Sequence, residues 1–224
     1  MSIKAIVLDF DGVILESVDT KTQAFQELFR AYPKHQAKIR QLHLENLGMS
    51  RYEKFHIIYR DYLRKPLEER ELTRLDEAFS QLVQQEILTC PLVPGAREFL
   101  QKYAARCSLF VVSATPEEEL RGIVAQRGLA QHFQGVYGAP RTKSQLLRGL
   151  LAQFGWKPSE VVFVGDAVND YLAAQEGEVP FVGRVPAGAV SPFPQDGILG
   201  TVEDLWQLDA RWPQLTERVS SLFP

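Results

Sequence analysis

The sequence predicts an α/β fold, a parallel sheet covered by helices, with a helical domain inserted after the first strand. Short apolar runs alternate with segments of helical periodicity along much of the 224 residues, as is typical of a parallel sheet with helices on both faces. The stretch from residue 16 to residue 91 interrupts this alternation, because its apolar spacing is helical throughout. A third observation is that acidic and hydroxyl residues directly follow several apolar runs.

The first predicted strand is Ile3–Leu8, a mostly apolar, β-branched segment that leads into Asp9. Such a composition indicates a strand buried on both faces. Three later runs have the same character and predict further strands: Leu109–Val112, Val161–Val164 and Phe181–Val182. Helical patterns at 120–127 and 146–151 separate them, and the Pro- and Gly-rich segment 183–197 predicts a loop. Ile198-Leu199 is a candidate for a short last strand.

The insert contains three apolar stripes with helical spacing, at 25–32, 52–63 and 72–83. Pro91, Pro94 and Gly95 then mark the return to the α/β part of the chain. The predicted domains are therefore an α/β core of residues 1–15 and 92–224 and a helical insert of residues 16–91.

The overall composition is that of an ordinary globular protein, with 45% hydrophobic and 24% charged residues. The net charge is -3 and no run of Lys and Arg stands out, so neither a nucleic acid nor a membrane is an expected partner. No apolar run approaches the roughly 18 residues that span a bilayer. Cys90 and Cys107 have no C-x-x-C spacing, which disfavours a zinc site and favours a cytoplasmic location. A monomer and a homodimer both stay open.

Asp9 and Asp11 follow the first strand, two residues apart. In an extended chain such residues face the same way, so the two carboxylates are expected to repel and the pKa of one to rise. A divalent cation relieves the repulsion, and oxygen-only ligands favour Mg²⁺. A carboxylate can also attack phosphorus, while a second acid exchanges protons with the leaving group and with water. The alternative interpretation is a simple turn, since Asp11-Gly12 is a common turn dipeptide.

Ser113 follows the second strand, and the next helix is predicted to start at Pro116 with Thr115 as its N-cap and Glu118 completing a capping box. The Ser113 hydroxyl and nearby backbone amides, that of Ala114 included, are candidates for binding a phosphoryl group. The alternative for Ser113 is a second capping hydroxyl.

Two further groups precede or begin helices. Lys143 can place a positive charge on a phosphate and on Asp9, although a lysine at a helix start is usually solvated. Asp166 and Asp170 follow the Val161–Val164 strand and are four residues apart, so one helical turn brings them together. Asp166 is a candidate metal ligand, and Asp170 a candidate water-mediated ligand or a partner of Lys143. Ordinary N-capping is the alternative.

All four groups fall at or just beyond the carboxyl ends of predicted parallel strands, where open α/β sheets bind ligands. Together they supply the nucleophile, acid/base, metal ligands and phosphate donors of phosphoryl transfer. In this order, Asp9-Phe10-Asp11-Gly12-Val13, Ser113, Lys143 and Gly165-Asp166-x-x-x-Asp170 resemble the four motifs of the haloacid dehalogenase superfamily, over about residues 3–183. The resemblance implies a Rossmann-like three-layer core with the first strand central. It also implies that Asp9, the backbone carbonyl of Asp11, and Asp166 ligate magnesium. The insert of residues 16–91 is similar to the helical cap domain of that superfamily, which makes residues 1–15 and 92–224 the catalytic core.

Several subclasses of that superfamily compete. Metal-independent haloacid dehalogenases lack the second aspartate of the first motif, which is present here as Asp11. Phosphonoacetaldehyde hydrolases use a cap lysine where this chain has Arg51, although Lys54 is close by. The loop Gly48-Met49-Ser50-Arg51 is similar to that of β-phosphoglucomutases. However, Leu47 and Lys21 replace a lysine and a histidine that are usual there.

The predicted function is therefore hydrolysis of a small phosphorylated metabolite, of the phosphoglycolate or sugar-phosphate type, by a magnesium-dependent phosphatase through an aspartyl-phosphate on Asp9. β-Phosphoglucomutase-like phosphoryl transfer is the alternative. A catalytically silent binding or regulatory domain is the candidate from another class. Such domains typically lose a motif residue, and none is lost here.

Residues outside the motifs leave open questions. Arg51 and Lys21 are hypothesised to project from the cap toward a second anionic or polar group of the substrate, the alternative being that both are solvated surface cations. Glu16 stands where an aspartate is usual, near the expected hinge, and no role is assigned to it. The four histidines match no motif and are interpreted as surface or packing residues: His35, His43, His56 and His132.

Overall fold

The computed structural model describes residues 2–222 and contains one parallel sheet with the strand order β3-β2-β1-β4-β5-β6. β1 lies at the centre, as predicted, because its apolar residues are covered on both faces. The strands are β1 (Ala5–Leu8), β2 (Ser108–Pro116), β3 (Gly135–Ala139), β4 (Val161–Gly165), β5 (Phe181–Arg184) and β6 (Gly200–Val202).

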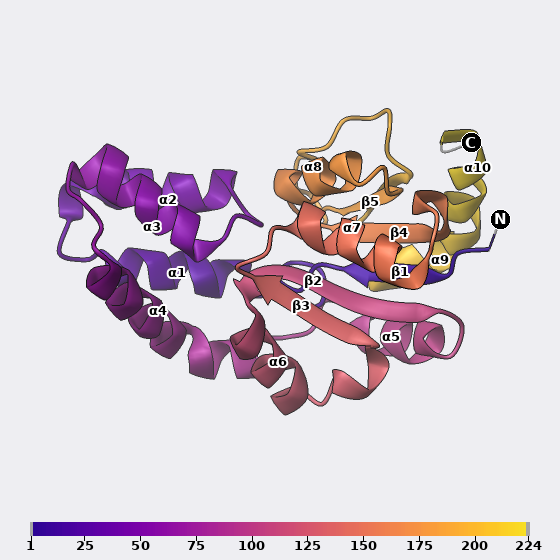
Figure 1. The fold of residues 1–224 in the computed structure, drawn as a ribbon, viewed down its shortest axis with the longest axis horizontal. Coiled ribbons are helices and arrows are strands. Elements are labelled where there is room, and N and C mark those ends of the chain that lie inside the picture. The colour runs from indigo at the N-terminus through magenta and orange to yellow at the C-terminus, as the bar shows by residue number, and fades with distance from the viewer. Residues whose placement is uncertain (1, 223–224) are drawn as a thin grey trace.

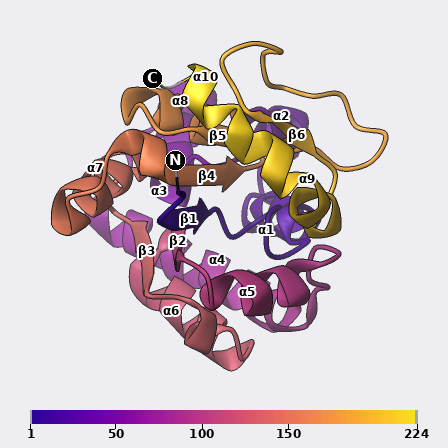
Figure 2. The ribbon, with the colours of Figure 1, turned by 90° about the vertical axis from the view of Figure 1, so that its right-hand side faces the viewer.

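Helices cover both faces of the sheet (Figure 2). The core helices are α5 (Ala96–Ala104), α6 (Glu117–Gln126), α7 (Lys143–Phe154), α8 (Val168–Glu176), α9 (Leu205–Glu217) and α10 (Val219–Leu222). Ile6 and Leu8 of β1 pack into the apolar cluster that includes α5, α6 and α9, whereas Ala5 and Val7 pack into the one that includes α7 and α8. This alternation along one strand produces the predicted Rossmann-like three-layer core.

The cap comprises the helices inserted between β1 and α5, and it lies beyond the end of the sheet toward which β2 and β3 point (Figure 1). Its elements are α1 (Val18–Leu28), η1 (Pro33–His35), α2 (Gln36–Glu45), α3 (Arg51–Ile57), η2 (Ile58–Leu63) and α4 (Glu69–Thr89). The cap has an apolar cluster of its own, built around the rings of Phe25, Phe29, Phe55 and Phe79. Most residues of the predicted helical stripes therefore pack into this cluster, whereas Leu82 is exposed.

β1 begins later than predicted, at Ala5, and β2 continues further, to Pro116. The third and the last strand differ most from the sequence prediction. β3 was not predicted, because it is a short edge strand containing two glycines, Gly135 and Gly138, and such a segment lacks the continuous apolar run of a buried strand. The last strand is Gly200–Val202 and not Ile198-Leu199. Both Ile198 and Leu199 are buried, so their apolar character reflects packing before the strand begins.

Candidate active site

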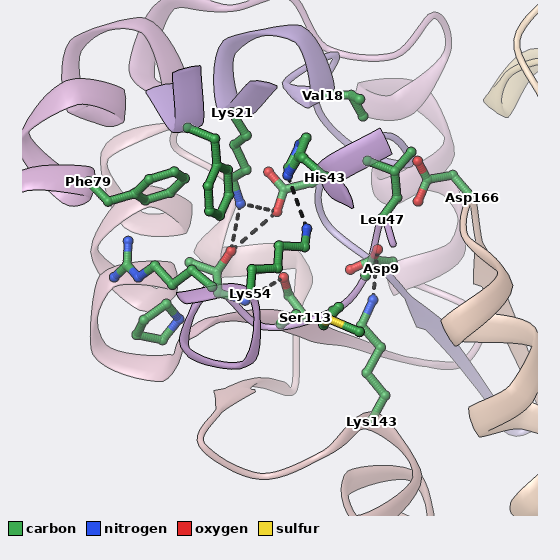
Figure 3. Close-up of a pocket in the computed structure, with 18 of the residues that line it drawn as sticks. Asp9, Val18, Lys21, His43, Leu47, Lys54, Phe79, Ser113, Lys143 and Asp166 are labelled. Atoms are coloured by element: carbon green, nitrogen blue, oxygen red, sulfur yellow. Dashed lines mark hydrogen bonds and ion pairs between the residues drawn. The ribbon is translucent and has the colours of Figure 1, made fainter. Parts of the chain in front are cut away.

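A pocket between the cap and the carboxyl end of the sheet brings most of the predicted site residues together (Figure 3). Its lining includes Asp9, Asp11, Ser113, Lys143 and Asp166. The sheet register explains the convergence, because Leu8 of β1 is paired with Val111 of β2 on one side and Val164 of β4 on the other. The segments that follow the three strands therefore emerge side by side.

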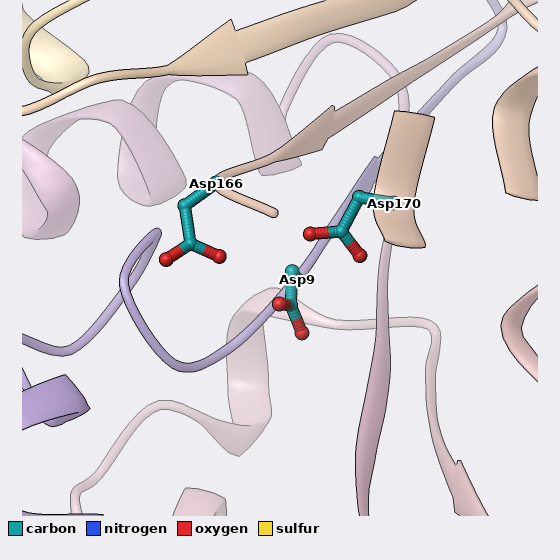
Figure 4. Close-up of side chains that lie close together, drawn as sticks. All are labelled: Asp9, Asp166 and Asp170. Atoms are coloured by element: carbon teal, nitrogen blue, oxygen red, sulfur yellow. The ribbon is translucent and has the colours of Figure 1, made fainter. Parts of the chain in front are cut away.

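Three carboxylates crowd one point of this pocket (Figure 4). Asp9, Asp166 and Asp170 each offer an oxygen, and these oxygens lie within 4.8 Å of one another. Burial raises the pKa of Asp9 to about 7, with Lys143 opposing the shift. Burial and the charges of Asp9 and Asp170 raise the pKa of Asp166 well above its usual value. Such crowding is unfavourable for carboxylates alone and suits a bound cation.

Lys143, at the start of α7, is the cation nearest this cluster. Its Nζ lies 2.9 Å from Asp9 Oδ2 and 2.5 Å from Asp170 Oδ1. Burial opposes the charge of Lys143, but the carboxylates of Asp170 and Asp9 outweigh burial and raise its pKa. Asp170 in turn accepts a hydrogen bond from the backbone N–H of Ala167 at 3.0 Å. Asp170 thus positions Lys143 against the Asp9 carboxylate, one of the two roles expected for it.

The Asp11 carboxylate does not join the cluster and turns instead toward the cap. It accepts hydrogen bonds from Ser17 Oγ at 2.6 Å, Lys21 Nζ at 2.5 Å and Thr115 Oγ1 at 3.2 Å. Burial alone would raise the pKa of Asp11, but Lys21 and the two hydroxyls outweigh burial and lower it. The expected crowding of Asp9 and Asp11 is therefore largely replaced by crowding of Asp9 with Asp166 and Asp170.

The segment after β2 also corrects a predicted helix cap. β2 continues to Pro116 and α6 begins at Glu117 without a side-chain cap. Thr115 was predicted to cap this helix, but its hydroxyl faces the pocket and bonds Lys21 at 2.8 Å as well as Asp11. Ser113 is buried, and its Oγ accepts the backbone N–H of Thr115 at 3.2 Å. That arrangement leaves the hydroxyl proton of Ser113 for a ligand.

Arg51 and Lys21 both line the pocket, so the alternative that they are solvated surface cations is wrong. Arg51 is buried, with Nε 2.6 Å from Asp76 Oδ1 in the cap and Nη2 2.5 Å from Glu119 Oε2 in the core. Lys21 is bound to Asp11. Each of the two cations therefore already has a carboxylate partner.

Several pocket residues had no predicted site role, among them His43 of α2 and Lys54 of α3. Both are buried, and Lys54 Nζ lies 3.0 Å from His43 Nδ1. The interpretation of His43 as a surface or packing residue is thus incomplete, because it also lines the pocket. A weak signal was available: Lys54 lies three residues after Arg51 and so shares its helix face.

Glu16 acquires a structural partner. Arg184 at the end of β5 is buried, and its Nη2 lies 2.5 Å from Glu16 Oε1. The same guanidinium donates from Nη1 to the backbone carbonyl of Gly12 at 3.2 Å. Arg184 therefore ties the start of the cap connection to the loop that follows Asp11.

The chain is similar in sequence to known proteins. The protein-family model for haloacid dehalogenase-like hydrolases matches residues 3–177. Phosphoglycolate phosphatase of Synechococcus elongatus is 26% identical over 183 residues, which are 77% of this chain and 79% of that protein.

Solved structures share the fold. A predicted phosphoglycolate phosphatase from Haemophilus somnus has a TM-score of 0.74 at 20% identity, covering 95% of this chain and 99% of the other. A putative β-phosphoglucomutase from Bacteroides vulgatus has a TM-score of 0.76 at 16% identity, covering 97% and 90%. Within the described residues, no helix combines the length and apolarity needed to cross a membrane.

Proposed function

The chain belongs to the haloacid dehalogenase-like hydrolases, and from this premise we propose that it is a magnesium-dependent phosphatase of a small phosphorylated metabolite. The reaction proceeds through an aspartyl-phosphate on Asp9. The observation that carries the proposal is the convergence of Asp9, Asp166 and Asp170 around one point with Lys143 beside them. The name of the Synechococcus relative supports the same chemistry.

The carboxylate cluster fits a divalent cation. Its three groups are oxygen donors only, and one lysine does not offset their combined charge. Asp166 has no hydrogen bond or ion pair with any other described residue. Asp9, Asp166 and Asp170 would hold Mg²⁺, together with the backbone carbonyl of Asp11. When bound, the ion offsets the negative charge of the phosphoryl oxygens.

In the first step Asp9 Oδ attacks phosphorus in line and the ester P–O bond breaks. The leaving oxygen takes a proton from Asp11, which Asp11 must first take up from solvent, because Lys21 and the two hydroxyls favour its ionised form. In the second step Asp11 takes a proton from water, whose oxygen attacks phosphorus and releases phosphate from Asp9. Lys143 and the Ser113 hydroxyl donate to the phosphoryl oxygens. The bonds to Lys21, Ser17 and Thr115 hold Asp11 in place and favour its ionised form, the base of the second step.

Substrate selection belongs to the cap. We propose that residues 16–91 form the cap domain and residues 1–15 with 92–224 the core, and that the enzyme acts in the cytoplasm as a monomer or homodimer. The pocket retains a cavity of about 60 Å³ with the cap in this position. The proposed substrate is a compact phosphate ester such as phosphoglycolate, in keeping with the name of the Synechococcus relative.

The test is phosphate release from p-nitrophenyl phosphate and from 2-phosphoglycolate with Mg²⁺. We expect hydrolysis by the wild type, its loss in excess EDTA, and at least a 1,000-fold lower kcat for Asp9→Asn, since typical nucleophile removals cost on the order of 10⁴ or more. Asp19→Asn changes an exposed acid of the cap and is the matched control. Equal activity of wild type and Asp9→Asn would indicate the silent binding domain instead.

A mutase is the second candidate, favoured by the position of Arg51 against the pocket. The guanidinium of Arg51 is bound to Asp76 and Glu119. Because both carboxylates already neutralise it, binding of a second substrate phosphate by Arg51 is disfavoured. With β-glucose 1-phosphate and a catalytic amount of glucose 1,6-bisphosphate, we expect no glucose 6-phosphate, with any turnover releasing inorganic phosphate. Accumulation of glucose 6-phosphate would favour the mutase.

A further inference from the structure

The cations of the pocket are not equally neutralised. Lys21 is paired with Asp11, Arg51 with Asp76 and Glu119, and Lys143 with Asp9 and Asp170. Lys54 lines the same pocket. Within residues 2–222, Lys54 has no carboxylate within ion-pair distance, and its hydrogen-bond partner is a ring nitrogen of His43.

The side chain of Lys54 is shielded from solvent. It is 3% exposed, and Nζ lies 5.4 Å from the centre of the Phe25 ring. Figure 3 shows it reaching into the pocket between His43 and Ser113. A buried ammonium without a counter-charge is costly. Burial and the nearby charge of Lys21 lower the pKa of Lys54 to about 7.

His43 supports Lys54 without neutralising it. Burial and the neighbouring Lys54 lower the pKa of His43 to about 3, so the imidazole is neutral and Nδ1 can accept a hydrogen bond from the lysine. The ring also packs against Phe25, with centroids 4.9 Å apart. His43 therefore orients a lysine whose charge is balanced only when an anion enters the pocket.

We propose that Lys54, oriented by His43, binds a carboxylate of the substrate, so that the enzyme selects compact phosphate monoesters that carry a second, singly charged anionic group. This inference rests on the proposed phosphatase function. A carboxylate matches the single charge that Lys54 offers, whereas a second phosphate dianion would be only half neutralised there.

The test compares two ligands of similar size, 2-phosphoglycolate and ethyl phosphate, which lacks the carboxylate. Lys54→Met keeps the length of the side chain and removes its charge. We expect this change to raise KM for 2-phosphoglycolate about 10- to 100-fold, the range expected for loss of one charge-assisted hydrogen bond. KM for ethyl phosphate and kcat for both should change less than about threefold. Lys34→Met replaces an exposed cap lysine and should alter neither.

Measuring ligand affinity in an inactive variant tests the role of Lys54 independently of the proposed phosphatase function. Calorimetry on Asp9→Asn protein with Mg²⁺ measures ligand affinity without turnover. Adding Lys54→Met should lower the affinity for 2-phosphoglycolate about 10- to 100-fold and that for ethyl phosphate little. This expectation holds whether or not the wild type is a good phosphatase. Lys54→Gln serves as a second variant if the Met protein unfolds. Equal loss for the two ligands, or no loss, overturns the role of Lys54. Absence of hydrolysis with this binding difference intact overturns only the proposed function. A Lys54-dependent preference for a sugar bisphosphate over 2-phosphoglycolate overturns the carboxylate assignment.

Discussion

Nη2 of Arg51 in the cap lies 2.5 Å from Oε2 of Glu119 in the core, so an ion pair spans the two parts of the molecule at the wall of the pocket. Ser80 of α4 donates to the same carboxylate oxygen at 2.7 Å. Glu119 therefore receives two bonds from the cap. Because these bonds exist only while the cap is docked, they stabilise the closed arrangement in which Lys21 reaches Asp11.

Glu119→Gln tests this contact. Loss of the charge leaves the hydrogen-bonding shape but weakens the bonds to Arg51 and Ser80, and we expect KM to rise about 3- to 10-fold for all phosphate esters alike, as for loss of a partly exposed charged contact. Steady-state kinetics on p-nitrophenyl phosphate and 2-phosphoglycolate provide the measurement. Glu118→Gln, at an exposed neighbour, should behave as wild type. An effect confined to 2-phosphoglycolate would show that Arg51 contacts the substrate's second group, as first hypothesised for this residue.

Metal binding should govern stability through the carboxylate cluster. Without Mg²⁺, burial and mutual repulsion disfavour the charged forms of Asp9 and Asp166, so Asp166→Asn should raise Tm in EDTA by several degrees, as expected for a gain of about 1 kcal/mol or more. With Mg²⁺ the wild type should gain stability and Asp166→Asn should gain little. Thermal unfolding in EDTA and in excess Mg²⁺ measures both effects, with Asp19→Asn as the control. A lower Tm of Asp166→Asn in EDTA would contradict the repulsion.

Lys54 should make stability depend on pH. Its pKa falls from 10.5 in the unfolded chain to about 7 in the folded protein. Between these values the unfolded state binds the extra proton, so the free energy of unfolding rises with pH in this window, and the full cost of Lys54 is present below it. Lys54→Met should therefore be more stable than wild type at a pH of about 7, by an amount on the order of a few kcal/mol, and this gain should shrink by a pH of about 9.5.

Urea unfolding of Lys54→Met and wild type at the two pH values checks this expectation. The measurement avoids the range below about pH 6.5, where His43, with a folded pKa of about 3, contributes a pH dependence of its own. Lys34→Met is again the matched control. A gain that stays constant between the two pH values would mean that the benefit comes from packing and not from titration.

Gly12 and Gly128 have similar backbone conformations but differ in the space around them, so alanine at each position separates the two effects. The φ of Gly12 is +74°, and a Cβ there would lie 2.0 Å from Asp166 Oδ2. Gly12→Ala should displace Asp166 and lower kcat/KM by at least about 100-fold, a loss typical of misplaced catalytic groups. Gly128 has a similar φ of +65° but nothing within 4 Å of its Cβ position. Gly128→Ala should cost only about 1 kcal/mol of stability and leave activity intact. Comparable activity of the two variants would refute the steric explanation.

Residues at the strand ends were predictable because their positions follow from local pattern and sheet geometry. An apolar run of four to six residues identifies a buried parallel strand, and the carboxyl ends of neighbouring parallel strands meet at one edge. That reasoning placed Asp9, Ser113 and Asp166 near one another, as the register of β1 with β2 and β4 confirms. The same reasoning did not predict the short edge strand β3, since its glycines interrupt the apolar pattern.

The sequence by itself determined the three-layer core, the helical insert and the order of the acidic and hydroxyl groups along the sheet edge, because these depend on periodicity and on chain direction. Only the tertiary structure decided the partners of Lys21, Arg51 and Lys54. Those side chains belong to the cap, and whether a carboxylate of the core reaches each of them depends on how the separately packed cap and core are docked against each other. No local pattern in the sequence encodes that docking, so the unpaired charge of Lys54 became visible only in the folded protein.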